Sequence, residues 1–431
     1  MRDGCRRRQL ILPLLCVVWL AGRPVAAAEP FRPEVGTFPP LEKAHAYRGE
    51  LVFVDHANRR GSLRVEGDGM FFRNSPHPFA MLPYGLIRYH GAPAALQDIP
   101  LGTVLHARGF LPPDPKISAV PVLPVDSKKQ DANHNRGAGI FPAENHLLLL
   151  EDELSHCLRE GKVWKLNELT IKNNTGQITA SRIVADAGAD TAKDPETESL
   201  TFDAGTRIWR GRECLTVADL IAEGNWPAEG KKSLDGQPVQ LGISWKPTPG
   251  GIFTRFHIAD IWLDAAAVTR AQQQQTEIHR AFVRSRWMPA FVNKVEYDSF
   301  GRATVTVELF GGMDPELYSD FQLDRQALIN GSENTLKHTG GQYGPTHMAS
   351  RGSIVGVTRA DGEVPLASSG IQVRFRTNLI IEAIRPNRVV RICPTSWPQV
   401  NLPREEYLGD GTFSHEDRFP TPAIFPVYER P

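Results

Sequence analysis

The residues of this chain that could carry out chemistry are scattered, and their spacing fits no catalytic or metal-binding motif. Six of the histidines stand in two groups, in the first third of the chain and around a glycine-rich stretch near residue 340: His56, His77, His90 and His106, and His338 and His347. A zinc site needs ligands at helical H-x-x-x-H or C-x-x-C spacing, and neither spacing occurs here. The sequence therefore predicts no metal site and no cofactor.

Nucleophile and phosphate-binding motifs are missing as well. The sequence contains no G-x-S-x-G elbow and no glycine-rich phosphate loop. His156 precedes Cys157 directly, but adjacent side chains usually point apart, so the pair does not predict an activated thiolate. The run Glu151-Asp152-Glu153 is most simply a solvated stretch of charge. Catalytic residues thus stay unknown, and an enzyme is the less favoured interpretation.

Aromatic and basic side chains are the best candidates for a binding surface. Small β-barrels of the OB type bind extended polymers on one face with such residues. Two segments combine them at strand-like positions, and the candidate binding residues are Tyr84, Arg88, Tyr89, Trp209, Arg210 and Arg212. The alternative, that these aromatic rings form the cores of small barrels, remains open.

The N-terminus has the three parts of an export signal. Arginines at positions 2 and 6–8 are followed by an apolar run over residues 10–20, and Ala26-Ala27-Ala28 supplies small residues for a signal peptidase. The apolar run is shorter than the roughly 20 residues that span a bilayer. We therefore predict a signal peptide over residues 1–28 and a secreted or periplasmic mature protein with no transmembrane segment. An uncleaved anchor is the alternative.

Composition is that of an ordinary globular protein with balanced charge. Hydrophobic residues make up 41% and charged residues 23%, and Lys plus Arg equals Asp plus Glu at 49 each. No net field favours nucleic acid, so no nucleic-acid partner is expected. The mature chain keeps three cysteines, Cys157, Cys214 and Cys393. Their number and spacing exclude a disulfide framework, although a single bridge between the first two remains open.

Patterning along the chain predicts a mainly β protein. Alternating apolar residues and turn signals predict one small barrel and then a second, with a third β-rich domain at the C-terminal end. One long helix begins at Asp264, which can cap it, and joins the last two domains. Its expected apolar face carries Val268, Ala271, Ile278 and Phe282, and residues 272–275 are expected mostly on the solvated side. The predicted segments are an extended lead-in over 29–46, barrel domains over 47–111 and 146–263, a flexible insertion over 112–145, the helix over 264–287, and a third domain with a proline-rich tail over 288–431. The tail, from Arg385 on, is expected to wrap the surface.

The two barrel segments repeat the same order of features. Each has a strand that ends in glycine, at Gly91 or Gly211, and then a short acidic turn containing Asp98 or Asp219. A strand led by glycine comes next in both. The repeat predicts two related domains in which the two aspartates cap equivalent helical turns.

These segments resemble the OB-fold-type small barrels of uncharacterised secreted bacterial proteins. The residues that carry the resemblance are Leu96-Gln97-Asp98-Ile99 and Gly102-Thr103-Val104, with their counterparts around residues 218–220 and 236–239. The phrase from Thr304 to Asp314 also looks like that of secreted proteins from planctomycete-like bacteria. The resemblance implies a fold and a compartment, but it implies no catalytic residue.

Two classes of function are consistent with these features. The favoured one is an exported, non-catalytic binding or structural module of the cell envelope, with an envelope polymer or protein as partner. The alternative is an extracytoplasmic hydrolase that acts on a polymeric substrate. A pocket that gathers a carboxylate pair or a His–Asp pair would favour the hydrolase.

Overall fold

Three β-sheets make up most of the protein, as the predicted fold class requires. The structure is a computed structural model. It describes residues 31–34, 37–56, 59–65, 77–111, 145–185, 196–247, 254–299, 302–331, 349–378, 384–398 and 400. Residues 31–431 form one compact unit. The predicted signal peptide, nearly all of the predicted insertion and His338 and His347 lie outside the described residues.

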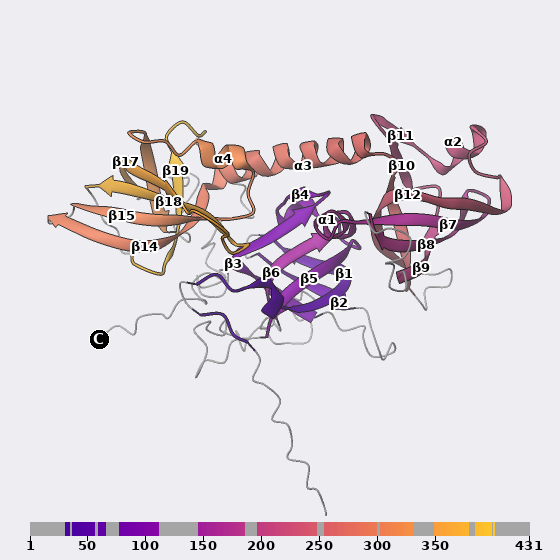
Figure 1. The fold of residues 1–431 in the computed structure, drawn as a ribbon, viewed down its shortest axis with the longest axis horizontal. Coiled ribbons are helices and arrows are strands. Elements are labelled where there is room, and N and C mark those ends of the chain that lie inside the picture. The colour runs from indigo at the N-terminus through magenta and orange to yellow at the C-terminus, as the bar shows by residue number, and fades with distance from the viewer. Residues whose placement is uncertain are drawn as a thin grey trace, which may run out of the picture. The chain divides into compact units, whose positions relative to one another are not determined.

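Sheet A holds the first group of strands and closes into a barrel through pairing of β2 with β3. Its strands are β1 (His45–Asp55), β2 (Arg60–Val65), β3 (His77–Tyr89), β4 (Ala92–Pro93), β5 (Val104–Phe110) and β6 (Asn145–Asp152). Short helices flank them: η1 (Leu41–Lys43), η3 (Leu96–Asp98) and α1 (Glu153–Arg159). Figure 1 labels the strands and α1.

Sheet B comes after sheet A in the chain and holds seven strands. They are β7 (Lys162–Lys172), β8 (Thr175–Val184), β9 (Glu196–Phe202), β10 (Arg207–Arg210), β11 (Glu213–Leu215), β12 (Glu229–Pro247) and β13 (Thr254–Trp262), with α2 (Val217–Ala222) between β11 and β12. Pairing of β9 with β13 joins five of them into a ring.

Sheets A and B share one strand order. The five ring strands, in chain order, are β1, β2, β3, β5 and β6 in sheet A, and β7, β8, β9, β12 and β13 in sheet B. In each ring, the first strand pairs antiparallel with the second and the fourth, and the second pairs with the third. The third runs parallel to the fifth, which pairs antiparallel with the fourth. The main difference lies in the third strand, which is the single strand β3 in sheet A and is divided into β9 and β10 in sheet B.

The acidic turns predicted from the sequence occupy the same place in both sheets. Helices η3 and α2 each lie between the third and fourth strands of their ring. Asp98 Oδ2 accepts the Ala95 N–H at 2.8 Å, and Asp219 Oδ2 accepts the Thr216 N–H at 2.7 Å. Each aspartate thus caps the start of its own helix from the third position.

A second pair of aspartates joins the same corner in both sheets. Asp152 ends β6 and accepts N–H bonds from Ser155 in α1 and from His90 in the β3–β4 turn, at 2.9 and 3.0 Å. Asp264 comes after β13 and accepts from Ala267 in the next helix and from Gly211 in the β10–β11 turn, at 2.8 and 2.9 Å. Each carboxylate therefore holds both a helix start and a hairpin turn.

These bonds correct the predicted register of the repeat by one residue. The sequence pattern aligns Gly91 with Gly211, but the residue that corresponds to Gly211 in the turn is His90. Both adopt a positive φ, 52° at His90 and 55° at Gly211. Each also stands eight positions before its capping aspartate, Asp98 or Asp219. Alternation and glycine content could not fix this register, because a positive φ is uncommon for any residue other than glycine.

The predicted long helix is confirmed as α3 (Ala265–Arg286), with Asp264 as its cap. Its buried face differs from the predicted one. Ile278, which was assigned to the apolar face, is 53% exposed. Gln275, which was assigned to the solvated side, is buried and donates to Asp98 Oδ2 at 2.9 Å. None of the described helices is long and apolar enough to cross a membrane.

Sheet C is a closed barrel in the order β14-β15-β18-β17-β16-β19, and every pairing in it is antiparallel. Its elements are β14 (Met288–Ser299), β15 (Arg302–Phe310), α4 (Pro315–Ser319), β16 (Gln326–Gly331), β17 (Ser350–Arg359), β18 (Ser368–Thr377) and β19 (Val389–Pro394). Asp314 caps α4, and Pro315 opens it.

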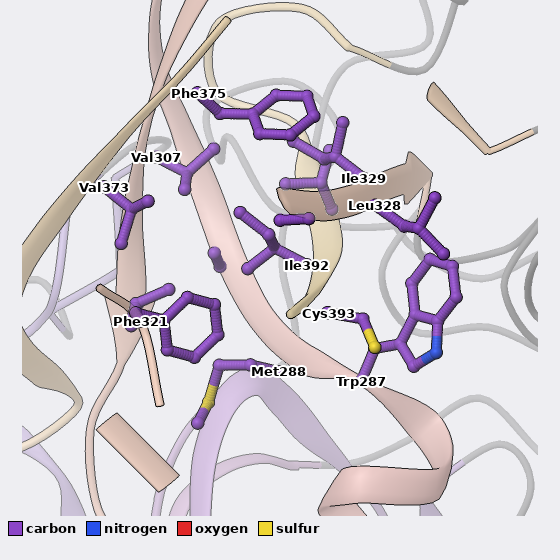
Figure 2. Packing of buried hydrophobic residues seen from close by; sticks show 14 of the residues in the cluster. Trp287, Met288, Val307, Phe321, Leu328, Ile329, Val373, Phe375, Ile392 and Cys393 are labelled. Atoms are coloured by element: carbon purple, nitrogen blue, oxygen red, sulfur yellow. The ribbon is translucent and has the colours of Figure 1, made fainter. Parts of the chain in front are cut away.

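Alternation explains the core of sheet C. Along β18 the apolar residues Ile371, Val373 and Phe375 are buried, and polar residues stand between them. Figure 2 shows Val373 and Phe375 among the other apolar side chains of this core. The predicted surface tail after residue 385 is wrong for β19, which pairs with β14 and β16 and so completes the barrel.

Candidate ligand-binding cavity

Charged side chains gather in a place that the sequence pattern did not predict. Glu151, Asp152 and Glu153 form no solvated run, because all three are at most 2% exposed. Each carboxylate is instead paired. Glu151 binds Arg159 and His156, and Asp152 caps α1.

Glu153 lies at the centre of a buried ion cluster between sheets A and B. Its carboxylate accepts from Arg48 at 3.2 Å, from Arg182 at 2.9 Å and from His106 at 2.7 Å. The Trp164 indole donates to it at 3.1 Å, and the Cys157 thiol at 3.4 Å. Burial alone would raise the pKa of Glu153, but these donors and charges hold it well below its usual range.

The pKa values of this cluster disfavour acid catalysis by its glutamates. A general acid needs a pKa near the working pH, which means a raised value for a carboxylic acid. The pKa of Glu151 is lowered as well, through its bonds to His156 and Arg159, which outweigh desolvation. Both glutamates therefore favour their charged form and pair with cations.

The three cysteines in the described part of the chain, Cys157, Cys214 and Cys393, form no disulfide with one another. All three are free, which answers the open question of a Cys157–Cys214 bridge in the structure. Burial raises the pKa of the Cys157 thiol, and the nearby charge of Glu153 raises it further. Within the described part of the chain, no group of three or more His, Cys, Asp or Glu residues could hold a metal ion.

The six predicted binding residues are spread over several parts of the structure. Tyr84 is buried, and its ring packs against those of Phe38, Phe291 and Phe310, with centroids 5.2, 5.6 and 6.0 Å away. It therefore joins a core between sheets A and C. Burial raises the pKa of its hydroxyl.

Tyr89 and Trp209 are brought together near Asp260. The Trp209 indole donates to Asp260 at 2.8 Å, and the charge of Asp260 helps raise the pKa of Tyr89, after desolvation and Asp152. Arg88 lies apart from them, and burial lowers its pKa although Glu151 is near.

The remaining two candidates are at the surface. Arg210 pairs with Glu213 and Glu223 at 3.0 and 2.9 Å. Arg212 is exposed and lines a shallow groove beside α3. The structure therefore gathers the six predicted residues into no single face.

A cavity of about 100 Å³ lies between sheet A, α3 and sheet C, and we call it the arginine cavity. Its walls are mostly apolar. The residues that line it include Leu86, Ile87, Ala95, Leu96, Phe282, Val283, Trp287, Phe310 and Met313. The polar and charged lining residues are His56, Arg59, Gln97, His279, Arg286 and Arg391. Tyr84 is the one predicted site residue among its lining residues.

Arg59 is an unusual cation, because it has no carboxylate partner among the described residues. Its guanidinium donates to the carbonyl oxygens of Leu82, Pro83 and Gly85, at 3.2, 2.6 and 2.6 Å. These bonds use three of the five N–H groups of a guanidinium. Burial lowers the pKa of Arg59 to about 10, yet part of its surface is accessible, as expected of a group that lines a cavity.

His279 faces the same cavity from α3 and is 5% exposed. Its Nδ1 has no hydrogen-bond partner in the described part of the structure. Desolvation lowers its pKa to about 4, with Asp314 opposing the shift and Arg59 adding to it. The imidazole is therefore neutral at pH 7, and the effect of Arg59 means that the two side chains are neighbours.

The end of α3 completes the polar side. The Arg286 guanidinium lies 4.1 Å from the centroid of the Phe282 ring and donates to Ser285 Oγ at 2.6 Å. Trp287 has a φ of 66°, a strained conformation for a bulky residue. Arg391 donates to the carbonyls of Arg286 and Trp287 at 3.0 and 3.3 Å, which fixes this corner.

Close packing of backbone shapes the wall made by sheet C. Gly312 has a φ of 73°, and a Cβ there would lie 2.3 Å from Leu86 Cδ2. A side chain at this position would push the loop after β15 away from β3. Glycine therefore lets the loop of sheet C close the cavity against sheet A.

Sequence reasoning missed this site because its polar residues lie far apart in the chain. Arg59 stands in a stretch whose sequence predicts a turn, and Arg391 in one that predicts a surface tail. A signal did exist in α3, where Gln275, His279 and Arg286 recur at three- and four-residue spacing with Val283. A polar stripe that includes one apolar residue predicts a buried face with polar partners.

Comparisons with known proteins provide no further assignment. No protein-family model matches the chain, and neither a curated protein nor a solved structure is significantly similar to it.

Proposed function

We propose that this protein is an exported, non-catalytic binding module of the cell envelope, and that it takes a small ligand into the arginine cavity. The observation that carries the proposal is Arg59, a largely desolvated cation held by three carbonyls beside an apolar cavity. A charge in such a place is costly unless an anion balances it. Pockets with apolar walls and a few convergent polar groups are typical ligand sites.

We also propose that sheets A and B are OB-type barrels. Support comes from their shared strand order, with a parallel contact between the third and fifth strands and a short helix before the fourth. Ligands of such barrels bind over the second and third strands and the loop between the first two. Arg59 and the residues around Gly85 belong to that region of sheet A.

The binding proposal is tested by what the purified protein carries. The mature protein, isolated from its native envelope, should release a small molecule on denaturation in about equimolar amount. Ala95→Leu, which adds three carbon atoms at the cavity wall, should carry much less. Release of equal amounts from both proteins, or of nothing from either, would contradict the assignment of the cavity as the site.

Export is tested separately by intact mass. Cleavage after Ala28 gives a native protein that begins at Glu29. A native mass that includes residues 1–28 would contradict cleavage and favour an uncleaved anchor.

A further inference from the structure

We infer that the ligand of the arginine cavity is a short-chain organic carboxylate, bound with its carboxylate toward Arg59 and His279 and its hydrocarbon part among the apolar walls. The inference rests on the proposed binding function and names the chemistry of its ligand. It is carried by three features of the cavity, which are its charge, its donors and its size.

Charge decides for an anion. Arg59, Arg286 and Arg391 all reach the cavity, and Arg59 lacks a carboxylate partner in the described residues. The described lining residues of the cavity include no carboxylate, and Asp314, whose charge acts on His279, is already bound by Arg280 at 2.5 Å. A neutral ligand would leave the charge of Arg59 unbalanced, whereas a monoanion would balance it.

The donors decide for an oxyanion. Two N–H groups of Arg59 remain after its three carbonyl bonds, and guanidinium donors suit carboxylate and phosphate oxygens. His279 is neutral, so it can donate one hydrogen bond from either ring nitrogen, and its Nδ1 is unpartnered among the described residues. These donors come from two separate elements, which favours one shared acceptor group.

Size and wall chemistry distinguish a carboxylate from inorganic phosphate. A cavity of about 150 Å³ holds a benzene molecule, so about 100 Å³ suits a molecule of about four to six non-hydrogen atoms. Most of the wall is hydrocarbon, including Leu86, Phe282 and Met313. A phosphate dianion would be desolvated against these walls without any gain from them, whereas an alkyl chain gains from apolar contact.

The test is calorimetric titration of the full mature protein with butyrate, butyramide and inorganic phosphate. Butyrate should bind, and butyramide, which has the same shape without the charge, should bind at least tenfold more weakly. Phosphate should not compete with butyrate. Tighter binding of butyramide or of phosphate than of butyrate would overturn the inference.

Variants locate the binding. Arg59→Lys keeps the charge but removes the planar fork, and should weaken butyrate at least fivefold. Since Arg59 also holds three carbonyls, this variant could fail to fold. His279→Phe keeps the shape of the site and removes its donor, and should also weaken butyrate. Arg376→Gln removes a charge from the exposed outside of sheet C and should leave binding unchanged.

The outcomes separate the inference from the function on which it rests. If the native protein carries a neutral molecule that Ala95→Leu excludes, the binding function stands and the carboxylate inference fails. If Ala95→Leu, still folded, binds butyrate as well as the wild type does, both the cavity and its proposed ligand are wrong.

Discussion

Sheets A and B have the same aspartate-capped corner but continue into helices of different length. In each, an aspartate at the end of the last ring strand caps the next helix and holds a hairpin turn, Asp152 in sheet A and Asp264 in sheet B. The next residue differs. Glu153 opens α1, a helix of seven residues, and Ala265 opens α3, a helix of 22. The shared corner is structural, and the helix that leaves it gives each sheet its own role.

The difference shows how two related sheets acquire separate roles. Glu153 directs α1 into the ion cluster that joins sheets A and B. At the same position α3 begins with Ala265, and this longer helix brings His279 and Arg286 to the arginine cavity. Helix α1 therefore helps to hold sheets A and B together, and α3 contributes to the proposed binding site.

The largest effect is expected at Glu153. Glu153→Ala removes the fully buried one of the two carboxylates that Arg48 and Arg182 share, and Glu198 remains as the other. It should reduce the free energy of unfolding by about 3 kcal/mol. Urea denaturation measures this loss. Glu196→Gln is the control, because Glu196 pairs with the same Arg182 from an exposed position. Similar losses in the two variants would remove the distinction between a cohesive and a peripheral carboxylate.

The stabilising contributions of His279 in α3 and Glu153 in α1 should be lost in different pH ranges. The pKa of His279 falls from about 6.5 to about 4 on folding, so protons bind the unfolded chain more tightly. The contribution of neutral His279 to the free energy of unfolding is fully present above pH 6.5 and is lost as the pH falls toward 4. The whole pKa shift of His279 corresponds to at most about 3 kcal/mol of this free energy. The lowered pKa of Glu153 acts in a lower window, with stability lost as the pH falls below about 4.5.

Variants at both positions measure these windows. His279→Phe should flatten the decline between pH 6.5 and 4, and Glu153→Gln should flatten the decline below it. His257 in sheet B, whose pKa is also lowered to about 4, provides a comparison outside the cavity. An unchanged pH profile in His279→Phe would mean that this histidine is not held neutral by burial.

Sequence patterns indicate single helices and strands because these depend on neighbouring residues. Alternation of apolar and polar residues is typical of a strand such as β18, and Asp264 predicted the start of α3, since a cap acts over three residues. Tertiary partners were beyond reach. Gln275 is buried because Asp98 receives its amide, and β19 comes after a proline-containing turn that hid its pairing with β14. The cavity at Arg59 forms only where β3, α3 and sheet C meet, so the sequence alone could not predict it.

The corner aspartates should come next in effect. Asp152→Ala removes acceptors for Ser155 and His90 N–H groups at a buried position and should cost about 2–3 kcal/mol. Asp264→Ala removes the matching pair, but Asp264 is half-buried, so water replaces part of the loss. We expect about 1–2 kcal/mol there by thermal denaturation. A negligible cost at either corner would break the equivalence of the two sheets.

The smallest effect is expected at the capping turns. Asp98→Ala removes the acceptor of the Ala95 N–H and of the Gln275 amide, and should cost about 1 kcal/mol or slightly more. Asp219 accepts from Thr216 alone, through its N–H and its hydroxyl, and is exposed. Asp219→Ala should therefore cost less than Asp98→Ala in urea denaturation.

The reason for this asymmetry is α3, and a double-mutant cycle isolates it. Gln275→Ala alone loses the bond to Asp98, so the double variant Asp98→Ala/Gln275→Ala should cost less than the sum of the single variants. Asp219 lacks a partner of this kind among its hydrogen bonds in the described structure, so Asp219→Ala should be additive with Gln275→Ala. Additivity at both aspartates would show that α3 does not depend on the η3 turn of sheet A. Coupling at Asp98 alone would mean that one copy of a repeated cap has become the anchor for the helix that forms the cavity.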